Sequence, residues 1–367
     1  MKSPSSISRV SFAVLSLGSI PAAMAAAQTP GAAGGQAPVS HRAIDTVPPK
    51  TVVETPFTIT SGTLTLSGTL TLPANASAKR SAKGKKLTVA VAKKLPVALI
   101  VAGSGPTDRN GNSAGALRAQ NNSNLYAILA WQLAASGIAS VRYDKRVIGD
   151  NLRKVDIPST SIDDFIADAI AGARELVADP RFSKVILIGH SEGAELVLQA
   201  VNRGAPAAGS VMMSGAGRPI MPVLREQISK QLPPTEIAKW DSASARYLRG
   251  EDPGDVHPGL KSLLQPANRK FMQSWAKYDP AAEIAKVKVP ILIIQGGHDI
   301  QISEADARAL KAAQPAARLV VIPAANHVFR ATTTDDRIAQ MKLYIDPTLP
   351  IVPELTPAIA NWIKGLK

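Results

Sequence analysis

The distribution of apolar residues along the chain predicts alternating strands and helices. Four short runs rich in valine, isoleucine and leucine are suited to buried parallel strands: residues 97–102, 185–188, 289–294 and 318–323. Segments with helical spacing of apolar positions lie between them, as at residues 194–201. The alternation predicts an α/β fold with a mostly parallel, twisted sheet and helices on both faces.

A long helical stretch interrupts this alternation. We expect residues 51–217 and 288–367 to form the core, and residues 218–287 to form a helical cap inserted over the site. The cap contains the aromatic residues Trp240, Tyr247, Phe271, Trp275 and Tyr278. Aromatic residues at helical spacing more often pack inside such a cap than line a pocket. Any that do line a pocket would favour apolar groups of a ligand.

The N-terminal segment has the pattern of an export signal. A basic start precedes an apolar run at residues 10–20 that is too short to span a bilayer, and Ala23-Met24-Ala25 offers a cleavage site. We therefore expect residues 1–27 to be a signal peptide and 28–50 a disordered tether rich in Ala, Gly and Pro. The mature protein would be periplasmic or secreted, with no transmembrane span; an uncleaved membrane anchor is the alternative.

The composition indicates a chain that can form one large hydrophobic core, and its net charge is unusually positive. The 367 residues are 45% hydrophobic, lack cysteine and carry a net charge of +14. Seven basic residues and no acids lie between Lys79 and Lys94, which we expect to form an extended hairpin tip. This tract is either a solvated loop or a weak contact for anionic envelope polymers. Its lack of aromatic residues argues against nucleic-acid binding.

The sequence Gly189-His190-Ser191-Glu192-Gly193 has the form of a nucleophile elbow. In such an elbow the serine lies on a turn so sharp that its neighbours two positions before and after must lack a side chain. An apolar strand precedes this motif and a helical pattern follows it, as the elbow requires. Ser191 is therefore the candidate nucleophile, although a serine that caps a helix at a tight turn would read similarly.

A serine nucleophile needs a histidine base and a carboxylate that orients the histidine. His327 is the best candidate because it follows a predicted strand, in a loop where catalytic groups of α/β sheets gather; a surface loop histidine is the alternative. The remaining histidines lie in the leader, inside the elbow, in a polar loop or beside a candidate acid: His41, His190, His257 and His298.

Asp299 is the candidate acid because it follows the apolar run at residues 289–294. Asp299 could instead cap the next helix, or that helix could supply Glu304 or Asp306 as the acid. With Asp299, the order along the chain is serine, acid, histidine, which is the order of α/β-hydrolases.

Acyl transfer also requires two N–H groups directed at the developing oxyanion. The N–H of Glu192, next to the nucleophile, would supply one, and that of Ser104, in the glycine-rich loop at residues 103–112, the other. This loop could also suit a phosphate, but no Rossmann or Walker glycine spacing is present. No residues have metal-ligand spacing, so we expect neither a metal nor another cofactor.

The chain resembles bacterial α/β-hydrolase serine esterases. The resemblance is carried by the loop Gly103–Asn112, by Arg142-Tyr143-Asp144-Lys145-Arg146 and by the segments around Asp299 and His327. Two positions depart from the pattern: Ala102 stands where relatives often have histidine, and Asn110 where many have aspartate. The resemblance implies hydrolysis of carboxylic esters, mainly with short acyl groups.

These observations predict a serine hydrolase that cleaves esters with short to medium acyl groups through an acyl-enzyme. Peptidase, thioesterase or acyltransferase activity on the same triad is the nearest alternative. A haloperoxidase-like or C–C bond hydrolase stays open because the fold does not fix the substrate. A non-catalytic envelope-binding protein is the alternative from a different class.

Overall fold

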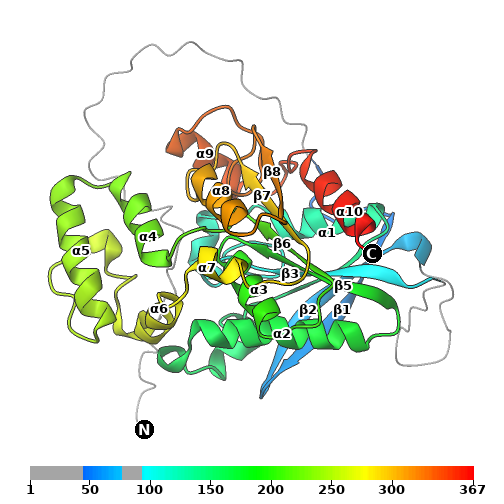
Figure 1. Cartoon of the computed structure of the whole chain (residues 1–367), viewed down its shortest axis with the longest axis horizontal. Helices are drawn as coiled ribbons and strands as arrows, with labels where there is room; N and C mark the ends of the chain where they lie inside the picture. The colour runs from blue at the N-terminus through cyan, green and yellow to red at the C-terminus, as the bar shows by residue number, and fades with distance from the viewer. Residues whose placement is uncertain (1–43, 77–92) are drawn as a thin grey trace, which may run out of the picture.

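The computed structural model describes residues 44–76 and 93–367, and its centre is an eight-stranded sheet (Figure 1). The strands are β1 (Val52–Ser61), β2 (Leu64–Pro73), β3 (Leu95–Val101), β4 (Ala139–Tyr143), β5 (Phe182–His190), β6 (Gly209–Met213), β7 (Ile291–Gly296) and β8 (Arg318–Ile322). The helices are α1 (Leu125–Ala135), α2 (Ile162–Ala178), α3 (Glu192–Asn202), α4 (Ile220–Ser229), α5 (Pro234–Leu248), α6 (Arg269–Trp275), α7 (Pro280–Ile284), α8 (Glu304–Ala313), α9 (Arg337–Ile345) and α10 (Leu355–Gly365).

The sheet is mostly parallel, as the alternating pattern predicted. Its strand order is β1-β2-β4-β3-β5-β6-β7-β8. From β4 to β8 every neighbouring pair is parallel, whereas β1 and β2 form an antiparallel hairpin whose second strand pairs with β4. The carboxyl ends of the six parallel strands consequently meet at one edge, where loops from distant parts of the sequence come together.

Both faces of the sheet are covered, which explains why β3, at its centre, is apolar at every position. Along β3, Val97 and Leu99 belong to the hydrophobic cluster that includes α2, whereas Ala98 and Ile100 belong to the cluster that includes α1 and α10. All four side chains are almost completely buried. Because side chains alternate between faces, a strand covered on both sides needs apolar residues throughout.

Helices α4 to α7 lie between β6 and β7 in the sequence, where the cap was predicted. Figure 1 shows α4, α5 and α6 grouped beyond one end of the sheet. Trp240, Tyr247 and Phe271 are buried in the same hydrophobic cluster as Val97 and Leu99 of β3, and the centre of the Phe271 ring lies 5.5 Å from that of Phe165 in α2. The apolar interior of the cap is therefore continuous with that of the core.

Two sequence-based expectations differ from the structure. Residues 77–92 of the basic tract lie outside the described residues, but the strands that flank the tract are not neighbours, because β4 lies between β2 and β3. The expected hairpin tip is therefore wrong: β2 pairs in a hairpin with β1 instead. The predicted tether also differs at residues 44–50, where the Ile44 N–H donates to the Thr348 carbonyl at 2.7 Å.

Candidate functional site

Ser191 lies on a sharp turn between β5 and α3. Its backbone has φ 57° and ψ −121°, an unfavourable region for a residue with a side chain. A Cβ atom on Gly189 would come within 2.0 Å of the Gly193 carbonyl oxygen, and one on Gly193 within 2.3 Å of the Val101 oxygen. Neither glycine can be replaced without moving the backbone, which is the steric requirement on which the sequence motif rests.

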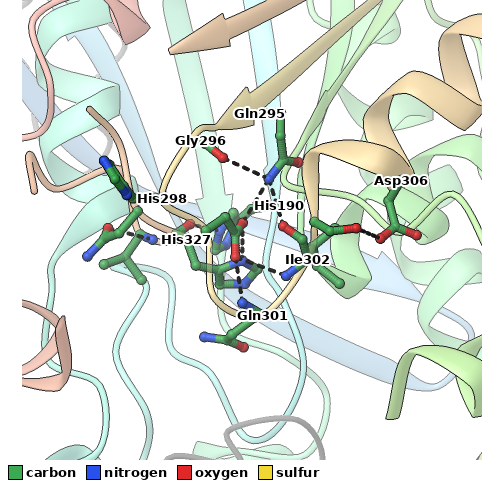
Figure 2. Close-up of polar contacts among 12 residues, drawn as sticks. His190, Gln295, Gly296, His298, Gln301, Ile302, Asp306 and His327 are labelled. Atoms are coloured by element: carbon green, nitrogen blue, oxygen red, sulfur yellow. Dashed lines mark hydrogen bonds and ion pairs between the residues drawn. The ribbon is translucent and has the colours of Figure 1, made fainter. Parts of the chain in front are cut away.

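His327 and Asp299 form a buried pair beside this turn. His327 Nδ1 lies 2.7 Å from Asp299 Oδ2, and the two side chains are 5% and 0% exposed. The other carboxylate oxygen of Asp299 accepts the N–H groups of Gln301 and Ile302 at 2.8 and 2.9 Å. Gln295 Nε2 also donates to Asp299 Oδ2 at 3.2 Å, and Figure 2 shows these partners, Gln295, Gln301, Ile302 and His327, close together. The N–H groups hold the carboxylate in place, so the imidazole has a fixed orientation.

The environment of Asp299 favours its ionised form. Burial alone would raise the pKa of Asp299, but the charge and hydrogen bond of His327 and the two backbone N–H groups outweigh it and lower the pKa. The aspartate therefore stays charged and can stabilise a protonated His327.

The alternative acids have other partners. Asp306 accepts two hydrogen bonds from Arg218 and one from Ser303, and Glu304 pairs with Arg308. Asp299 contacts His327 and binds the backbone of the turn before α8, whereas the N-cap position of α8 itself is Ser303. The remaining described histidine of that segment, His298, pairs with Asp335 and not with Asp299.

His190 and Tyr126 support the site and were not assigned a role from the sequence. The Tyr126 hydroxyl accepts the Gly103 N–H at 2.9 Å and lies 3.0 Å from His190 Nδ1. His190 Nε2 lies 2.8 Å from the His327 carbonyl oxygen, which can only accept, so Nε2 carries the proton and Nδ1 accepts the tyrosine O–H. Burial, with the charge of His327, lowers the pKa of His190 to about 3, so this imidazole is neutral. The chain of bonds links the glycine-rich loop to the backbone of His327.

The two predicted oxyanion donors lie on either side of a buried ion pair. Lys145 Nζ donates to the Gly103 carbonyl oxygen at 2.9 Å and to Glu192 Oε1 at 2.7 Å. Within the described residues, neither the Ser104 nor the Glu192 N–H donates to a protein acceptor. Both groups are therefore available to a ligand.

The glycine-rich loop is held in place by charged and amide side chains. Asp108 accepts the N–H groups of Asn110 and Asn112 at 2.8 and 2.9 Å, and Arg109 pairs with Asp144. Asn110, which replaces an aspartate of the relatives, accepts from Arg142 at 3.1 Å. The loop geometry is thus set by neighbours from the Arg142–Arg146 segment.

Comparison with known proteins identifies the family. The model of the alpha/beta hydrolase family matches residues 116–341, which is more than half of the chain. The chain belongs to the alpha/beta hydrolase family. Esterase EstD of Thermotoga maritima is 28% identical over 213 residues, which make up 58% of this hydrolase and 48% of EstD. The match therefore spans about half the length of this curated relative.

Solved structures agree on the fold of the hydrolase. Est1E from Butyrivibrio proteoclasticus is 15% identical, with a TM-score of 0.50 over 84% of this chain and 97% of Est1E. A hypothetical protein from Pseudomonas aeruginosa is 16% identical, with a TM-score of 0.55 over 91% of this chain and all of its own. At these identities the solved structures establish the fold alone.

A cavity of about 530 Å³ brings the predicted residues of the hydrolase together. Ser104, Ser191, Asp299 and His327 all line it, whereas Glu192 lines a smaller cavity of about 20 Å³ that also reaches Ser191. The larger cavity has a volume usual for a small-molecule site. Within the described residues its wall contains none of the five cap aromatics, in keeping with the expectation that such residues more often pack inside the cap than line a pocket; Trp275 and Tyr278 line the smaller cavity.

In the described part of the chain, no three His, Cys, Asp or Glu residues are grouped as metal ligands. Over the same residues, no helix has the length and apolar character needed to cross a bilayer. The predicted signal peptide at residues 1–27 lies outside the described residues.

Proposed function

We propose that this hydrolase cleaves carboxylic esters with short to medium acyl groups, with Ser191 as the nucleophile. The observation that carries the proposal is the buried Asp299–His327 pair, at 2.7 Å, in the wall of the cavity that Ser191 also lines. The 28% identity to EstD over part of both chains adds support for ester substrates.

In this mechanism His327 removes the proton of Ser191 as its oxygen attacks the ester carbonyl. Asp299 keeps the imidazole oriented and stabilises its charge. The N–H groups of Ser104 and Glu192 stabilise the oxyanion. His327 then protonates the leaving alcohol, and the same imidazole activates the water that releases the acid from Ser191.

Labelling with a fluorophosphonate, followed by a substrate panel, tests this function. The probe should modify Ser191, as read by mass spectrometry of the labelled peptide. p-Nitrophenyl acetate and butyrate should then be cleaved faster than the matched amide and thioester. Faster amide cleavage would indicate a peptidase. Absence of label on a folded protein would instead favour a non-catalytic envelope-binding protein.

We also propose that the protein is exported after cleavage of its leader and acts in the periplasm or outside the cell. The basic start, the short apolar run and Ala23-Met24-Ala25 support this. Residues Lys79 to Lys94 would add a weak contact with anionic envelope polymers that salt disrupts. Mass spectrometry of the N-terminus of the native protein tests export, and a retained Met1 would contradict cleavage.

A further inference from the structure

Gln227, Gln231 and Gln301 are three of the four glutamines that line the large cavity, and among the described residues no donor binds their side-chain carbonyl oxygens. Gln227 and Gln231 lie in and just after cap helix α4, and Gln301 lies two residues after Asp299. Gln231 Nε2 donates to the Gln227 backbone at 3.1 Å, Gln227 Nε2 to the Gln301 backbone at 3.0 Å, and Gln301 Nε2 to the Tyr344 hydroxyl at 3.2 Å. We call these three residues the glutamine row.

The amide nitrogens fix the row and leave its oxygens as acceptors. Within the described chain, no donor reaches Oε1 of Gln227, Gln231 or Gln301, although neighbouring polar groups of this cavity are paired. An amide oxygen accepts hydrogen bonds and carries no net charge. The row therefore suits a ligand with several neutral donors, such as the hydroxyl groups of a polyol.

Charge gives a second reason to expect a neutral ligand. Lys230 pairs with Glu226 at 3.0 Å, and the acidic residues Glu304 and Asp335 pair with Arg308 and His298. These three charged side chains of the cavity wall are thus already engaged within the protein, as Asp299 is with His327; the wall also contains Arg337. An ionic substrate would have to break these pairs, whereas a polyol would not.

We propose that the leaving alcohol of the ester is polyhydroxylated, as in an acylated sugar, and that its free hydroxyls donate to the glutamine row. This inference rests on the proposed function, because it assigns the alcohol half of the substrate to the cavity beside Ser191. The Ser191 oxygen forms the acyl bond as the bond to the sugar oxygen breaks. His327 passes the serine proton to that oxygen, and water later hydrolyses the acyl-enzyme.

Two acetates that differ only in hydroxyl groups near the ring test the proposal. Methyl 6-O-acetyl-glucopyranoside and cyclohexylmethyl acetate share the acyl group and a six-membered ring. We expect kcat/KM, measured by acetate release, to be at least about tenfold higher for the sugar ester, since each hydrogen bond contributes a few-fold. Equal or faster cleavage of cyclohexylmethyl acetate would overturn the assignment.

Substitution of Gln231 tests whether the glutamine row causes the preference for the sugar ester over cyclohexylmethyl acetate. Gln231→Met should lower the ratio of the two kcat/KM values by about three- to tenfold, the effect of one lost hydrogen bond. Gln231→Glu, which keeps acceptor oxygens, should retain more of the ratio. The matched control is Gln273→Met: Gln273 is a cap glutamine that also binds a backbone carbonyl, that of Leu248, but does not line the cavity. Its ratio should equal the parental one.

Failure of this proposal is distinguishable from failure of the proposed function. If fluorophosphonate labels Ser191 and both acetates are cleaved with the same ratio in Gln231→Met, the glutamine row does not bind the alcohol but the esterase assignment stands. If Ser191 is not labelled and neither acetate is cleaved, both proposals fail.

A separate observation concerns Lys145, which contacts both loops that carry the proposed oxyanion donors. Its ammonium donates to the Gly103 carbonyl oxygen and to the Glu192 carboxylate. The side chains of Lys145 and Glu192 are 5% and 0% exposed. The Gly103 oxygen and the Ser104 N–H belong to one trans peptide group, so they point in opposite directions.

From this geometry we infer that Lys145 is a positioning residue for the oxyanion hole. The ammonium fixes the plane of the Gly103–Ser104 peptide and polarises it, which makes the Ser104 N–H a stronger donor on the far side. Through Glu192 it also holds the first residue of α3, whose N–H is the second donor. The effect should be greatest on the transition state, where the oxyanion forms.

Two variants test this role: Lys145→Met, and the double variant Lys145→Met/Glu192→Gln, which removes both charges of the buried ion pair. In Lys145→Met we expect kcat to fall about 10- to 100-fold with little change in KM, and the affinity for a trifluoromethyl ketone to fall in parallel, since polarised donors act on the oxyanion. The double variant Lys145→Met/Glu192→Gln removes the uncompensated carboxylate and should restore the melting temperature but not kcat. Restoration of kcat, or a change confined to KM, would contradict the role.

Lys184→Met is the control, because Lys184 Nζ also donates to a backbone carbonyl, that of Leu366, away from the cavity. Its kcat should equal the parental value. Labelling of Ser191 by fluorophosphonate in all variants separates this role from the proposed function itself.

Discussion

Two buried acid–base pairs flank the turn that carries Ser191, and they differ in what the base can do. Asp299 and His327 lie on the side of β7 and β8, and Glu192 and Lys145 on the side of β3 and β4; both pairs have a contact of 2.7 Å. An imidazole gains and loses a proton near neutral pH, whereas an ammonium keeps its charge. The first pair is therefore suited to proton transfer, and the second to holding a fixed field around a developing anion.

The largest effect should follow loss of the proton-transfer pair or its nucleophile. His327→Ala and Ser191→Ala should each lower kcat by about 10⁴- to 10⁶-fold, and the double variant should be little worse than either, because the residues act as a unit. Turnover of a p-nitrophenyl ester measures this. His257→Ala, in a cap loop, is the control and should keep parental turnover. Near-parental activity in Ser191→Ala would break the comparison.

Asp299→Asn should have the next largest effect. The amide keeps an oxygen for the two backbone N–H groups but cannot stabilise the charged His327, so kcat should fall by about 10³- to 10⁴-fold with the fold retained. Asp306→Asn removes a different buried carboxylate, one that binds Arg218. It should lower the melting temperature without a comparable loss of turnover. A similar kcat in the two variants would argue against Asp299 as the acid.

Tyr126→Phe tests the hydrogen-bond chain through Tyr126 and His190 that links the Gly103 loop to the His327 backbone. The change leaves the Gly103 N–H and His190 Nδ1 without their partner, so the free energy of unfolding should fall by about 1–3 kcal/mol. Because Gly103 precedes the proposed donor Ser104, kcat should fall as well. Tyr247→Phe removes a buried hydroxyl that donates to the Gln265 carbonyl in the cap. It should cost stability alone, as measured by urea denaturation beside kinetics.

The smallest effect concerns Glu195, which lies one turn after Glu192 and pairs with no cation in the described structure. Burial, together with Glu283 and Asp279, raises the pKa of Glu195 from 4.5 to about 7, although Gln199 opposes this. Between pH 4.5 and 7 the Glu195 carboxyl therefore binds a proton in the folded protein that it has lost in the unfolded chain. As the pH rises through this range, the Glu195 contribution lowers the free energy of unfolding. His190, with a pKa lowered from 6.5 to about 3, has the opposite sign, since the unfolded chain binds the proton there.

The two contributions offset each other between pH 4.5 and 6.5. Glu195→Gln should remove one of them, so that stability rises with pH over this range by about 1.4 kcal/mol per unit relative to the parent. Urea unfolding at several pH values measures the slope. Glu354→Gln, at an exposed position, should leave the slope unchanged. An unchanged slope in Glu195→Gln would show that Glu195 is ionised in the fold.

The sequence predicted the fold and the candidate nucleophile because both depend on local constraints. Gly189 is required by backbone contacts within the turn itself, and Gly193 by the close approach of the Val101 and Ala102 backbone at the end of β3; the spacing of the two glycines around Ser191 is nevertheless visible in the chain. Asp299 and His327 were found because each follows an apolar run, and carboxyl ends of parallel strands meet at one edge. The expected hairpin around the basic tract was wrong because local alternation does not say which strands pair; β4 enters between β2 and β3 from a distant part of the chain.

By itself, then, the sequence determined the order of strands and helices, the elbow and the residues that compete for its base and acid. Only the tertiary structure decided that Asp299 and not Asp306 reaches His327, that Lys145 holds the Gly103–Ser104 peptide, and that glutamines of the cap and core share one cavity wall. The physical reason is range. Steric demands of a turn act between neighbours in the chain, whereas hydrogen bonds between distant loops exist only after the sheet has brought those loops to the same edge.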